Sequence, residues 1–382
     1  MTSVDKQPIR LVQIDLAALR HNLITLKALA GPGVKMLAVV KSDAYGHGLV
    51  PASQVFAEAG ADFLGVFDLE EAVSIRAAGL DLPVVLMGGV AADYAEEVIR
   101  LRLSPVIWDV ATARCLAAAA VKSGRSCRVH IKVDTGMGRL GVTIEEAVDF
   151  IQSISTLEGL SVEAVMSHLA EADGPEVDYT RVQEGRFQSV TDQLAATSCQ
   201  PGTMWHLANS AGLLYHPTAR LDLVRPGIAL YGSPPTRPRD CSHQSPTLKP
   251  AMTFKSRVIQ IKEIPAGAAI GYGCTFRAQG RMRLAVAPVG YRDGFFRALS
   301  NKGVALIRGR RVPLIGSVCM NLTMFDITQV PEVLPGDEIV FLGQQGRGRI
   351  MAEEIAAAAG TISYEVYCAL GRLNPREYLW SD

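Results

Sequence analysis

Residues 35–41 read KMLAVVK, a short apolar, β-branched run that opens the pattern deciding the fold. Further runs of this kind follow before residue 232, and segments of helical periodicity, such as 17–30, 70–78, 111–121 and 180–195, lie between most of them. These later runs are 63–67, 83–87, 105–109, 127–134, 162–168, 204–208 and 221–231. Such alternation indicates βαβ units around a parallel sheet. Eight strands favour an α/β fold closed as a (β/α)8 TIM-like barrel, because open doubly wound sheets usually stop at about five or six.

A second domain is expected after the barrel. Residues 232–250 (GSPPTRPRDCSHQSPTLKP) concentrate proline, serine and charge without periodicity, which is typical of a linker. Beyond them, apolar runs at 254–261, 283–289, 303–307 and 337–342 are separated by Gly and Pro turns, with one helical stretch at 352–359. We predict a barrel over residues 1–240 and a mainly β domain over 241–382, with residues 1–12 able to pair with the second domain.

Composition favours an enzyme that acts on a small molecule. Hydrophobic residues make up 48% and charged residues 20%, so disordered and fibrous classes are excluded. Lys+Arg and Asp+Glu both number 38, which leaves no net field to attract nucleic acid or an anionic membrane. No apolar run reaches the ~18 residues of a membrane span, and the N-terminus is polar, so we expect a cytoplasmic protein.

The cysteines argue against disulfides and metal. There are 7, an odd number with no C-x-x-C pair: Cys115, Cys127, Cys199, Cys241, Cys274, Cys319 and Cys368. A disulfide framework would use an even number, and a structural zinc site would use closely spaced pairs. We therefore expect scattered reduced thiols and no bound metal.

Several polar residues follow predicted strands and would meet at the C-terminal mouth of the barrel, where barrel enzymes carry out their chemistry. Lys41 closes the first run, and a lysine beside other cations in a partly apolar mouth suits Schiff-base formation; an ordinary solvated lysine is the alternative. A histidine such as His168, taken alone, is more often structural than catalytic. Ser210 and Gly227 lie after the last two strands, where barrels often bind phosphate.

The run 136–141 (GMGRLG) matches the G-x-G-x-x-G pattern of dinucleotide-binding turns. It follows the fifth of eight strands, and Glu158 precedes the next strand, whereas a ribose-binding acid should end that strand. We therefore favour another interpretation, in which the glycine-rich turn presents Arg139 to a ligand that approaches closely. In the β domain, Tyr272 lies between two glycines and would be accessible for acid/base chemistry.

Taken together, the motifs resemble those of one family. They are AVVKSDAYGHG (38–48), KVDTGMGRLG (132–141), MSHLAEAD (166–173), NSAG (209–212), RPGIALYG (225–232), GYG (271–273), VGYRDG (289–294) and CMN (319–321). In this order, over nearly the whole chain, they resemble the alanine racemases, which use pyridoxal 5'-phosphate (PLP). The resemblance implies a PLP-binding barrel, a mainly β domain, and a head-to-tail homodimer in which the β domain completes the partner's site.

The resemblance also implies residue roles. Lys41 would hold PLP covalently, Arg139 would bind its phenolic oxygen, and Arg225, supported by His168, would face its pyridine nitrogen. The phosphate ligands would be Tyr45, Ser210, Gly227, Ile228 and Tyr364. Tyr272 would arrive from the other subunit as the second acid/base, with Arg139 and Met320 near the substrate. Lys132 matches a lysine that is carbamylated in many members, and the access channel would include Asp173, Tyr291 and Arg297.

The chemistry explains this choice of residues. Racemisation removes a proton from one face of Cα and delivers one to the other, so Lys41 and Tyr272 on opposite faces suffice. Arginine keeps its proton, so Arg225 would donate to the ring nitrogen without protonating it, whereas a decarboxylase of this fold would use an acidic residue there. Asn321 replaces an expected aspartate and Ser317 an expected arginine, so a serine or broad-specificity racemase stays open. The role would be supply of D-alanine for peptidoglycan or alanine catabolism.

Overall fold

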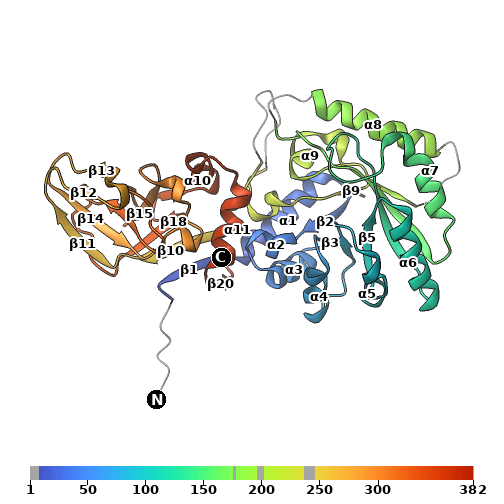
Figure 1. Ribbon diagram of the computed structural model, residues 1–382, viewed down its shortest axis with the longest axis horizontal. Helices are drawn as coiled ribbons and strands as arrows, with labels where there is room; N and C mark the ends of the chain where they lie inside the picture. The colour runs from blue at the N-terminus through green and yellow to red at the C-terminus, as the bar shows by residue number, and fades with distance from the viewer. Residues whose placement is uncertain (1–7, 175–177, 196–201, 236–245, 382) are drawn as a thin grey trace, which may run out of the picture. The chain divides into compact units, whose positions relative to one another are not determined.

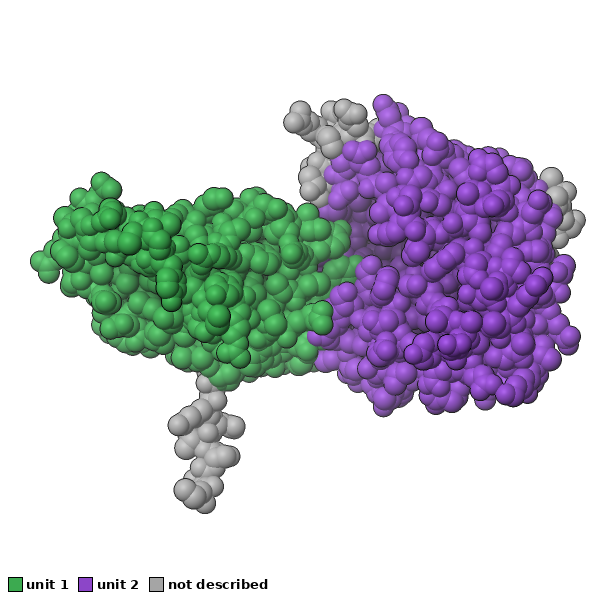
Figure 2. Space-filling view, viewed as in Figure 1, with its two compact units in different colours: residues 1–18, 45–48, 250–382 green, residues 19–44, 49–249 purple. Residues whose placement is uncertain are grey.

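The computed structural model describes residues 8–174, 178–195, 202–235 and 246–381 (Figure 1). The chain divides into two compact units, coloured separately in Figure 2. Unit 1 contains residues 1–18, 45–48 and 250–382, and unit 2 contains residues 19–44 and 49–249. Two early segments of the chain therefore belong with the C-terminal residues.

Unit 2 is built around eight parallel strands, which pair in the order β8-β7-β6-β5-β4-β3-β2-β9. The strands are β2 (Lys35–Val39), β3 (Phe63–Val66), β4 (Val84–Leu86), β5 (Leu103–Ile107), β6 (Cys127–Lys132), β7 (Leu160–Met166), β8 (Met204–His206) and β9 (Leu223–Val224). Backbone hydrogen bonds from Asp222 N to Trp205 O and from Arg225 N to Ala208 O link the first and last strands of this order. The predicted (β/α)8 barrel is confirmed.

Helices cover the outside of the barrel (Figure 1). They are α1 (Leu16–Ala30), α3 (Leu49–Glu58), α4 (Leu69–Ala77), α5 (Ala95–Arg100), α6 (Val110–Lys122), α7 (Ile144–Ser155), α8 (Asp178–Ala195) and the short α9 (Ser210–Tyr215). Helix α7 shows how the sequence specifies them. Thr143 and Glu146 form a capping box at its start, and Ala147, Phe150 and Ile151 lie on its buried face.

The last predicted strand, 221–231, is shorter in the structure. Strand β9 has two residues, and a 3-10 helix, η3 (Ile228–Tyr231), follows it. Pro226 has no N–H to donate to a strand ladder, so the chain leaves the sheet at this point. Tyr231 then packs fully buried, and its hydroxyl donates to Val39 O at 2.9 Å.

Unit 1 is mainly β, as predicted. One sheet has the order β16-β15-β18-β10-β1-β20, with β19 paired to β18; a second has the order β11-β14-β17, and β12 pairs with β13. The strands are β1 (Arg10–Asp15), β10 (Met252–Arg257), β11 (Gln260–Ile264), β12 (Ala269–Ile270), β13 (Phe276–Arg277), β14 (Met282–Ala287), β15 (Val304–Ile307), β16 (Arg310–Pro313), β17 (Thr323–Asp326), β18 (Glu338–Gln345), β19 (Gly348–Ile350) and β20 (Arg376–Leu379). Strand β1 pairs with β10 and β20, which is why the N-terminal segment belongs to this unit.

The expectation of a single helical stretch in this unit is wrong. Helix α10 (Ala352–Ala359) is followed by a second helix, α11 (Ser363–Leu373). Its sequence, SYEVYCALGRL, mixes helix formers (Glu, Ala, Leu and Arg) with two tyrosines, a valine and a glycine, so local propensity gives only a weak helical signal. Burial of Val366, Tyr367 and Leu370 stabilises it in the helical form.

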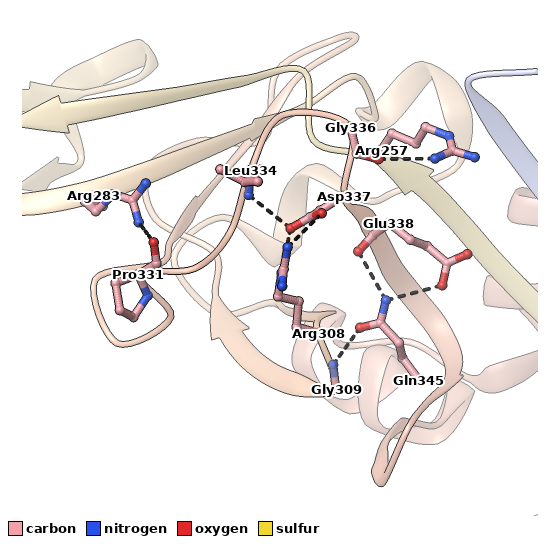
Figure 3. Close-up of polar contacts among 10 residues, drawn as sticks. All are labelled: Arg257, Arg283, Arg308, Gly309, Pro331, Leu334, Gly336, Asp337, Glu338 and Gln345. Atoms are coloured by element: carbon pink, nitrogen blue, oxygen red, sulfur yellow. Dashed lines mark hydrogen bonds and ion pairs between the residues drawn. The ribbon is translucent and has the colours of Figure 1, made fainter.

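Polar contacts join the β15–β16 turn to strand β18 and to Asp337 just before it (Figure 3). The guanidinium of Arg308 donates to both carboxylate oxygens of Asp337, at 2.7 and 3.2 Å. Gln345 accepts from Gly309 N at 2.9 Å and donates to Glu338 O at 3.1 Å. The hydrogen bond and charge of Arg308 lower the pKa of Asp337.

Across the described ranges, none of the helices combines the length and apolar character needed to cross a membrane.

Candidate active site

Lys41 begins an unusual left-handed turn, labelled α2 (Lys41–Tyr45), immediately after strand β2. Ser42, Asp43, Ala44 and Tyr45 all have φ between 53° and 56°. This conformation costs roughly 1–2 kcal/mol for each non-glycine residue, and such strain is typical of functional sites. The turn projects from the carboxyl end of the first barrel strand, and the Lys41 ammonium lies 5.8 Å from the centre of the Phe67 ring.

Side-chain hydrogen bonds compensate for the strain in this turn. The carboxylate of Asp43 accepts from Leu49 N at 2.8 Å, which closes the loop onto the start of α3. Asp43 N donates to Glu71 at 3.2 Å, and the other oxygen of Glu71 accepts from Phe67 N at 2.9 Å. Glu71 therefore joins the loops that follow the first two barrel strands.

Lys132 is the last residue of β6 and lies inside the barrel. Its Nζ is buried and has no hydrogen-bond partner among the described residues. Burial, together with the charges of Arg225 and Arg139, lowers the pKa of Lys132 to about 7 despite the opposing effect of Asp134. A large fraction of this amine is therefore neutral at physiological pH.

The glycine-rich loop after β6 is organised by Asp134. Its carboxylate accepts from Gly136 N at 2.9 Å, Met137 N at 2.8 Å and Gly138 N at 2.9 Å. Gly136, Gly138 and Gly141 have φ of 131°, 69° and 122°, so the shape of this turn accounts for all three glycines. The loop presents Arg139 on its exposed side.

Arg225 is almost completely buried, at 2% exposure, and uses both ends of its guanidinium fork. Nη1 donates to Nδ1 of His206 at 3.0 Å. Nη2 lies 2.7 Å from Ser167 O, 3.0 Å from Leu207 O and 3.2 Å from Nδ1 of His168. Nε is also buried but has no partner among the residues that the structure describes. Burial lowers the pKa of Arg225 to about 9, so the group remains cationic near neutral pH.

Several basic side chains lie around His168. Its pKa is held well below the usual value by burial and by four positive charges, those of Arg225, Lys132, Arg139 and Lys41. These four side chains come from the ends of three barrel strands: Lys41 follows β2, Lys132 ends β6 with Arg139 in the loop after it, and Arg225 follows β9. His168 and His206 are both neutral for the same two reasons, burial and the charge of Arg225, so each can accept a hydrogen bond from it.

The segments after β8 and β9 are joined by Ser210. Its hydroxyl accepts from Gly227 N at 2.9 Å and Ala229 N at 3.3 Å. Asn209 caps α9 by accepting from Gly212 N. Helix α9 and η3 therefore begin beside each other, and the first N–H groups of a helix have no partner within it. The predicted residues Ser210, Gly227 and Ile228 are all buried here.

Two further predicted residues meet within unit 1. Tyr45 ends the left-handed turn, and its ring centre lies 5.9 Å from that of Tyr364 on α11. Burial and the neighbouring Tyr364 and Cys368 raise the pKa of Tyr45, which keeps its hydroxyl protonated. Helix α11 anchors the pair, because Gly46 lies close to the backbone of Tyr367 on this helix. The carbonyl of Gly46 also accepts from Arg376 on β20 at 3.2 Å.

The remaining predicted residues of unit 1 either contact the segment 317–320 or belong to it. Tyr272 is 70% exposed, between Gly271 and Gly273, and its carbonyl accepts from Ser317. Cys319 O accepts from Tyr291 N at 3.1 Å, and Val318 O accepts from Arg297 at 3.1 Å. Met320 is also exposed. Asp173, in unit 2, lies partly buried between β7 and α8.

Several residues that support these groups were not predicted from the sequence. His206 binds Arg225 directly, and Asp134 binds the backbone of the glycine-rich loop. Gln183 on α8 donates to the hydroxyl of Thr135 and to His168 O. One available signal was polarity within apolar strands. His130 and Lys132 are two apart on the same buried strand, so both lie on the same side of the sheet.

Comparisons with known proteins agree with this architecture. Family models described as the N-terminal and C-terminal domains of alanine racemase match residues 14–235 and 251–378. The chain is 46% identical over 361 residues to an alanine racemase of Syntrophobacter fumaroxidans, covering 94% of this chain and 95% of that protein.

Solved structures give the same result. The alanine racemase of Clostridium difficile 630 superposes with a TM-score of 0.90 at 32% identity, covering 99% of this chain and 97% of that one. The alanine racemase of Bartonella henselae, with covalently bound pyridoxal phosphate, superposes with a TM-score of 0.87 at 28% identity over 98% of this chain and 100% of that one. The chain belongs to the alanine racemase family.

Proposed function

We propose that the protein interconverts L-alanine and D-alanine with PLP as its cofactor. The observation that carries the proposal is the buried Nε of Arg225, the one nitrogen of the fork without a partner among the described residues. It lies in the barrel mouth with Lys41, Arg139 and Lys132, so a single ligand there would meet four basic groups.

The residues fit PLP by their chemistry. Arg225 Nε–H suits a ring-nitrogen acceptor, Arg139 suits a phenolate, and Lys41 supplies the amine for covalent attachment. The backbone groups at Ser210, Gly227 and Ile228 suit a phosphate, and we assign Tyr45 and Tyr364 to the same phosphate. PLP, when bound, acts as an electron sink that eases ionisation of the substrate Cα–H bond.

The protein's own residues then have to exchange the proton at Cα and keep the ring nitrogen of the cofactor unprotonated. Lys41 exchanges a proton with Cα on one face, and Tyr272 of the partner subunit does so on the other. Arg225 donates a hydrogen bond but keeps its proton, because even its lowered pKa of about 9 exceeds neutral pH. Less of the negative charge formed at the substrate Cα then reaches the pyridine ring of PLP, and this favours reprotonation at Cα over transamination.

We propose a homodimer with shared sites, because Tyr272 is accessible. Its side chain is 70% exposed on a turn between two glycines, the arrangement expected of a group that serves another subunit. Met320 and Arg139 would lie near the substrate carboxylate, and Asp173, Tyr291 and Arg297 would line the access channel.

Lys132 is proposed to carry a carbamate. Its neutral amine can attack CO2, forming an N–C bond and releasing a proton, and the product would be an anion beside Arg139. The buried Nζ without a partner and its pKa of about 7 support this assignment. The carbamate would orient Arg139 toward the cofactor.

Two alternatives remain for the substrate and reaction. A serine or broad-specificity racemase is kept because Asn321 and Ser317 depart from the expected pattern, and both flank Met320. A decarboxylase of the same fold is less favoured, since Arg225 is not acidic. We place the enzyme in the cytoplasm, supplying D-alanine for peptidoglycan or serving alanine catabolism.

The test is incubation of the PLP-loaded protein with L-alanine, and separately L-serine, in D2O. NMR follows exchange of the Cα proton, and chiral chromatography follows the D-enantiomer. We expect both signals with alanine, and their loss in Lys41→Ala. Faster turnover of serine would favour the first alternative, amine formation with release of CO2 would favour the second, and full activity in Lys41→Ala would contradict the assignment of Lys41.

A further inference from the structure

One loop of unit 1, residues 288–294, binds the backbone next to Met320. Tyr291 N donates to Cys319 O at 3.1 Å. Arg292 N donates to Met320 O, also at 3.1 Å. The N–H of Met320 itself has no hydrogen-bond partner among the described residues. The loop therefore fixes two successive carbonyl groups and leaves the N–H between them available to a ligand.

A glycine lets the loop come this close. At Gly290, an added Cβ would clash with the carbonyl oxygens of both Cys319 and Met320. The φ of Gly290 is −155°, an extended conformation that any residue adopts, so the close approach alone requires the glycine. Since groups packed this tightly transmit strain, a shift of the loop also shifts the two carbonyls that it touches.

The carboxylate of Asp293 holds the loop in this position. Asp293 is buried, and its Oδ2 accepts from Gly290 N at 3.0 Å. Its Oδ1 lies 3.3 Å from Nε of Arg10 on β1. Nη1 of the same arginine donates to Pro288 O at 3.0 Å. Arg10 and Asp293 together therefore bind the start of the loop and the glycine that touches the backbone of Met320.

The end of the loop is attached to α11 by different atoms. Asn374, just after this helix, donates to Asp293 O and to Leu370 O, both at 2.8 Å. These bonds use the backbone carbonyl of Asp293 and not its carboxylate, so a substitution of the side chain leaves them in place. The side chain of Asp293 serves the contact with Met320, whereas its backbone serves the packing on α11.

We propose that Asp293 is a positioning residue for substrate binding: with Arg10 it holds the 288–294 loop in the position that orients the N–H of Met320. The inference rests on the proposed function in taking Met320 to lie near the substrate carboxylate, in a site shared between subunits. Because desolvation opposes the attraction within a buried ion pair, such a pair adds little net stability, and positioning accounts for it better.

The first experiment measures the contact without requiring turnover. Hydrogen exchange with mass spectrometry follows the peptide that contains the N–H groups of Tyr291 and Arg292. In Asp293→Asn, which keeps the size but loses the charge, we expect exchange about tenfold faster than in the wild type, the effect of weakening one charged hydrogen bond. Arg10→Met, on a partly exposed side chain, should act in the same direction. Wild-type exchange in Asp293→Asn would overturn the proposal.

Asp337 provides a matched control in the same unit (Figure 3). Its carboxylate also binds an arginine, Arg308 at 2.7 Å, and one backbone N–H, that of Leu334 at 3.0 Å. Asp337→Asn therefore weakens the same kind of ion pair in a turn elsewhere in unit 1. Exchange at residues 291–292 should keep its wild-type rate in this variant, and an equal acceleration would overturn the specific role of Asp293.

The second experiment separates positioning from a general loss of stability. An N–H that binds substrate and transition state alike acts mainly on KM, so KM for alanine should rise about tenfold in Asp293→Asn while kcat changes less. A substitution that only unfolds part of the enzyme lowers kcat through the active fraction and leaves KM unchanged. An unchanged KM in a folded Asp293→Asn enzyme would overturn the proposal.

The third experiment uses the shared site. In a heterodimer of Lys41→Ala and Tyr272→Phe protomers, the one complete site takes Tyr272 from the first protomer and Lys41 from the second. Asp293→Asn should raise KM when it is added to the Lys41→Ala protomer, and should have no effect when it is added to the Tyr272→Phe protomer. A merely structural role would act equally in both arrangements, and that result would overturn the proposal.

The outcomes distinguish this inference from the proposed function. If the wild type racemises alanine but Asp293→Asn has the wild-type KM, the role of Asp293 is overturned and racemisation stands. If the wild type does not racemise alanine, the proposed function fails, and hydrogen exchange alone decides whether Asp293 holds the loop. If no mixture of variants recovers activity, the shared site fails, and KM of the uniform Asp293→Asn enzyme decides the role.

Discussion

The hydroxyl of Ser317 donates to the backbone carbonyl of Tyr272 at 2.8 Å. Ser317 is buried at 4% exposure, whereas Tyr272 is 70% exposed. A buried residue therefore fixes the turn that presents an exposed phenol. Gly271 and Gly273, both at positive φ, provide the backbone conformation that this turn requires.

Removing this hydroxyl should reduce turnover more than stability. Ser317→Ala loses one neutral hydrogen bond, so the Tyr272 turn samples more conformations and kcat should fall about fivefold. Steady-state kinetics with alanine and a thermal unfolding scan would measure both effects. Ser317→Thr, which keeps the hydroxyl, is the control, and an unchanged kcat in Ser317→Ala would show that the contact has no catalytic consequence.

Asp134 should be required for the order of the loop that presents Arg139. Asp134→Ala leaves three backbone N–H groups without their acceptor, so we expect the free energy of unfolding to fall by about 1.5–3 kcal/mol. Hydrogen exchange of residues 135–141 should also accelerate. Asp134→Asn keeps one oxygen and should retain part of the protection. Equal exchange rates in wild type and Asp134→Ala would contradict the assignment.

Lys132 should make stability depend on pH in a specific direction. Its pKa is about 7 in the folded protein, against about 10.4 for an unfolded lysine. Below pH 7 both states carry the proton and the full cost of burying the charge is present. Between the two pKa values the unfolded state binds more protons, so the free energy of unfolding rises with pH.

The measurement compares wild type with Lys132→Met, which is uncharged and of similar length. Denaturant unfolding in CO2-free buffer between pH 6.5 and 9.5 should show a rising wild-type curve relative to the variant. Parallel curves would contradict the lowered pKa. Addition of 13C-bicarbonate should then produce a carbamate signal in the wild type and none in Lys132→Met.

Shared sites predict complementation between inactive variants. In a heterodimer of Lys41→Ala and Tyr272→Phe protomers, one site receives both intact residues and the other receives neither. Equal mixing should therefore recover about a quarter of wild-type activity once subunits exchange. Each variant alone, treated identically, is the control, and no recovery with heterodimers confirmed by mass spectrometry would exclude a shared site.

Much of the fold was predictable because it depends on local pattern. Apolar β-branched runs marked the eight barrel strands, and helix boundaries such as 17–30 agreed with α1 within a residue or two. Prediction failed at two elements whose local signal is weak. Helix α11 mixes helix formers with tyrosine, valine and glycine and is stabilised by burial of one face, and the last barrel strand ends early because Pro226 cannot donate to the ladder.

The site divides in the same way. Lys41, Arg139 and Ser210 could be proposed because each follows a predicted strand, and the ends of parallel strands converge. Arg225 lies inside the run 221–231 and was proposed from the resemblance to the alanine racemases. The sequence by itself therefore determined which basic groups the barrel mouth contains. Only the tertiary structure decided what those groups can do. The left-handed turn of residues 42–45, the partnerless Nε of Arg225 and the lowered pKa of Lys132 arise from burial and from hydrogen bonds between strands far apart in the chain.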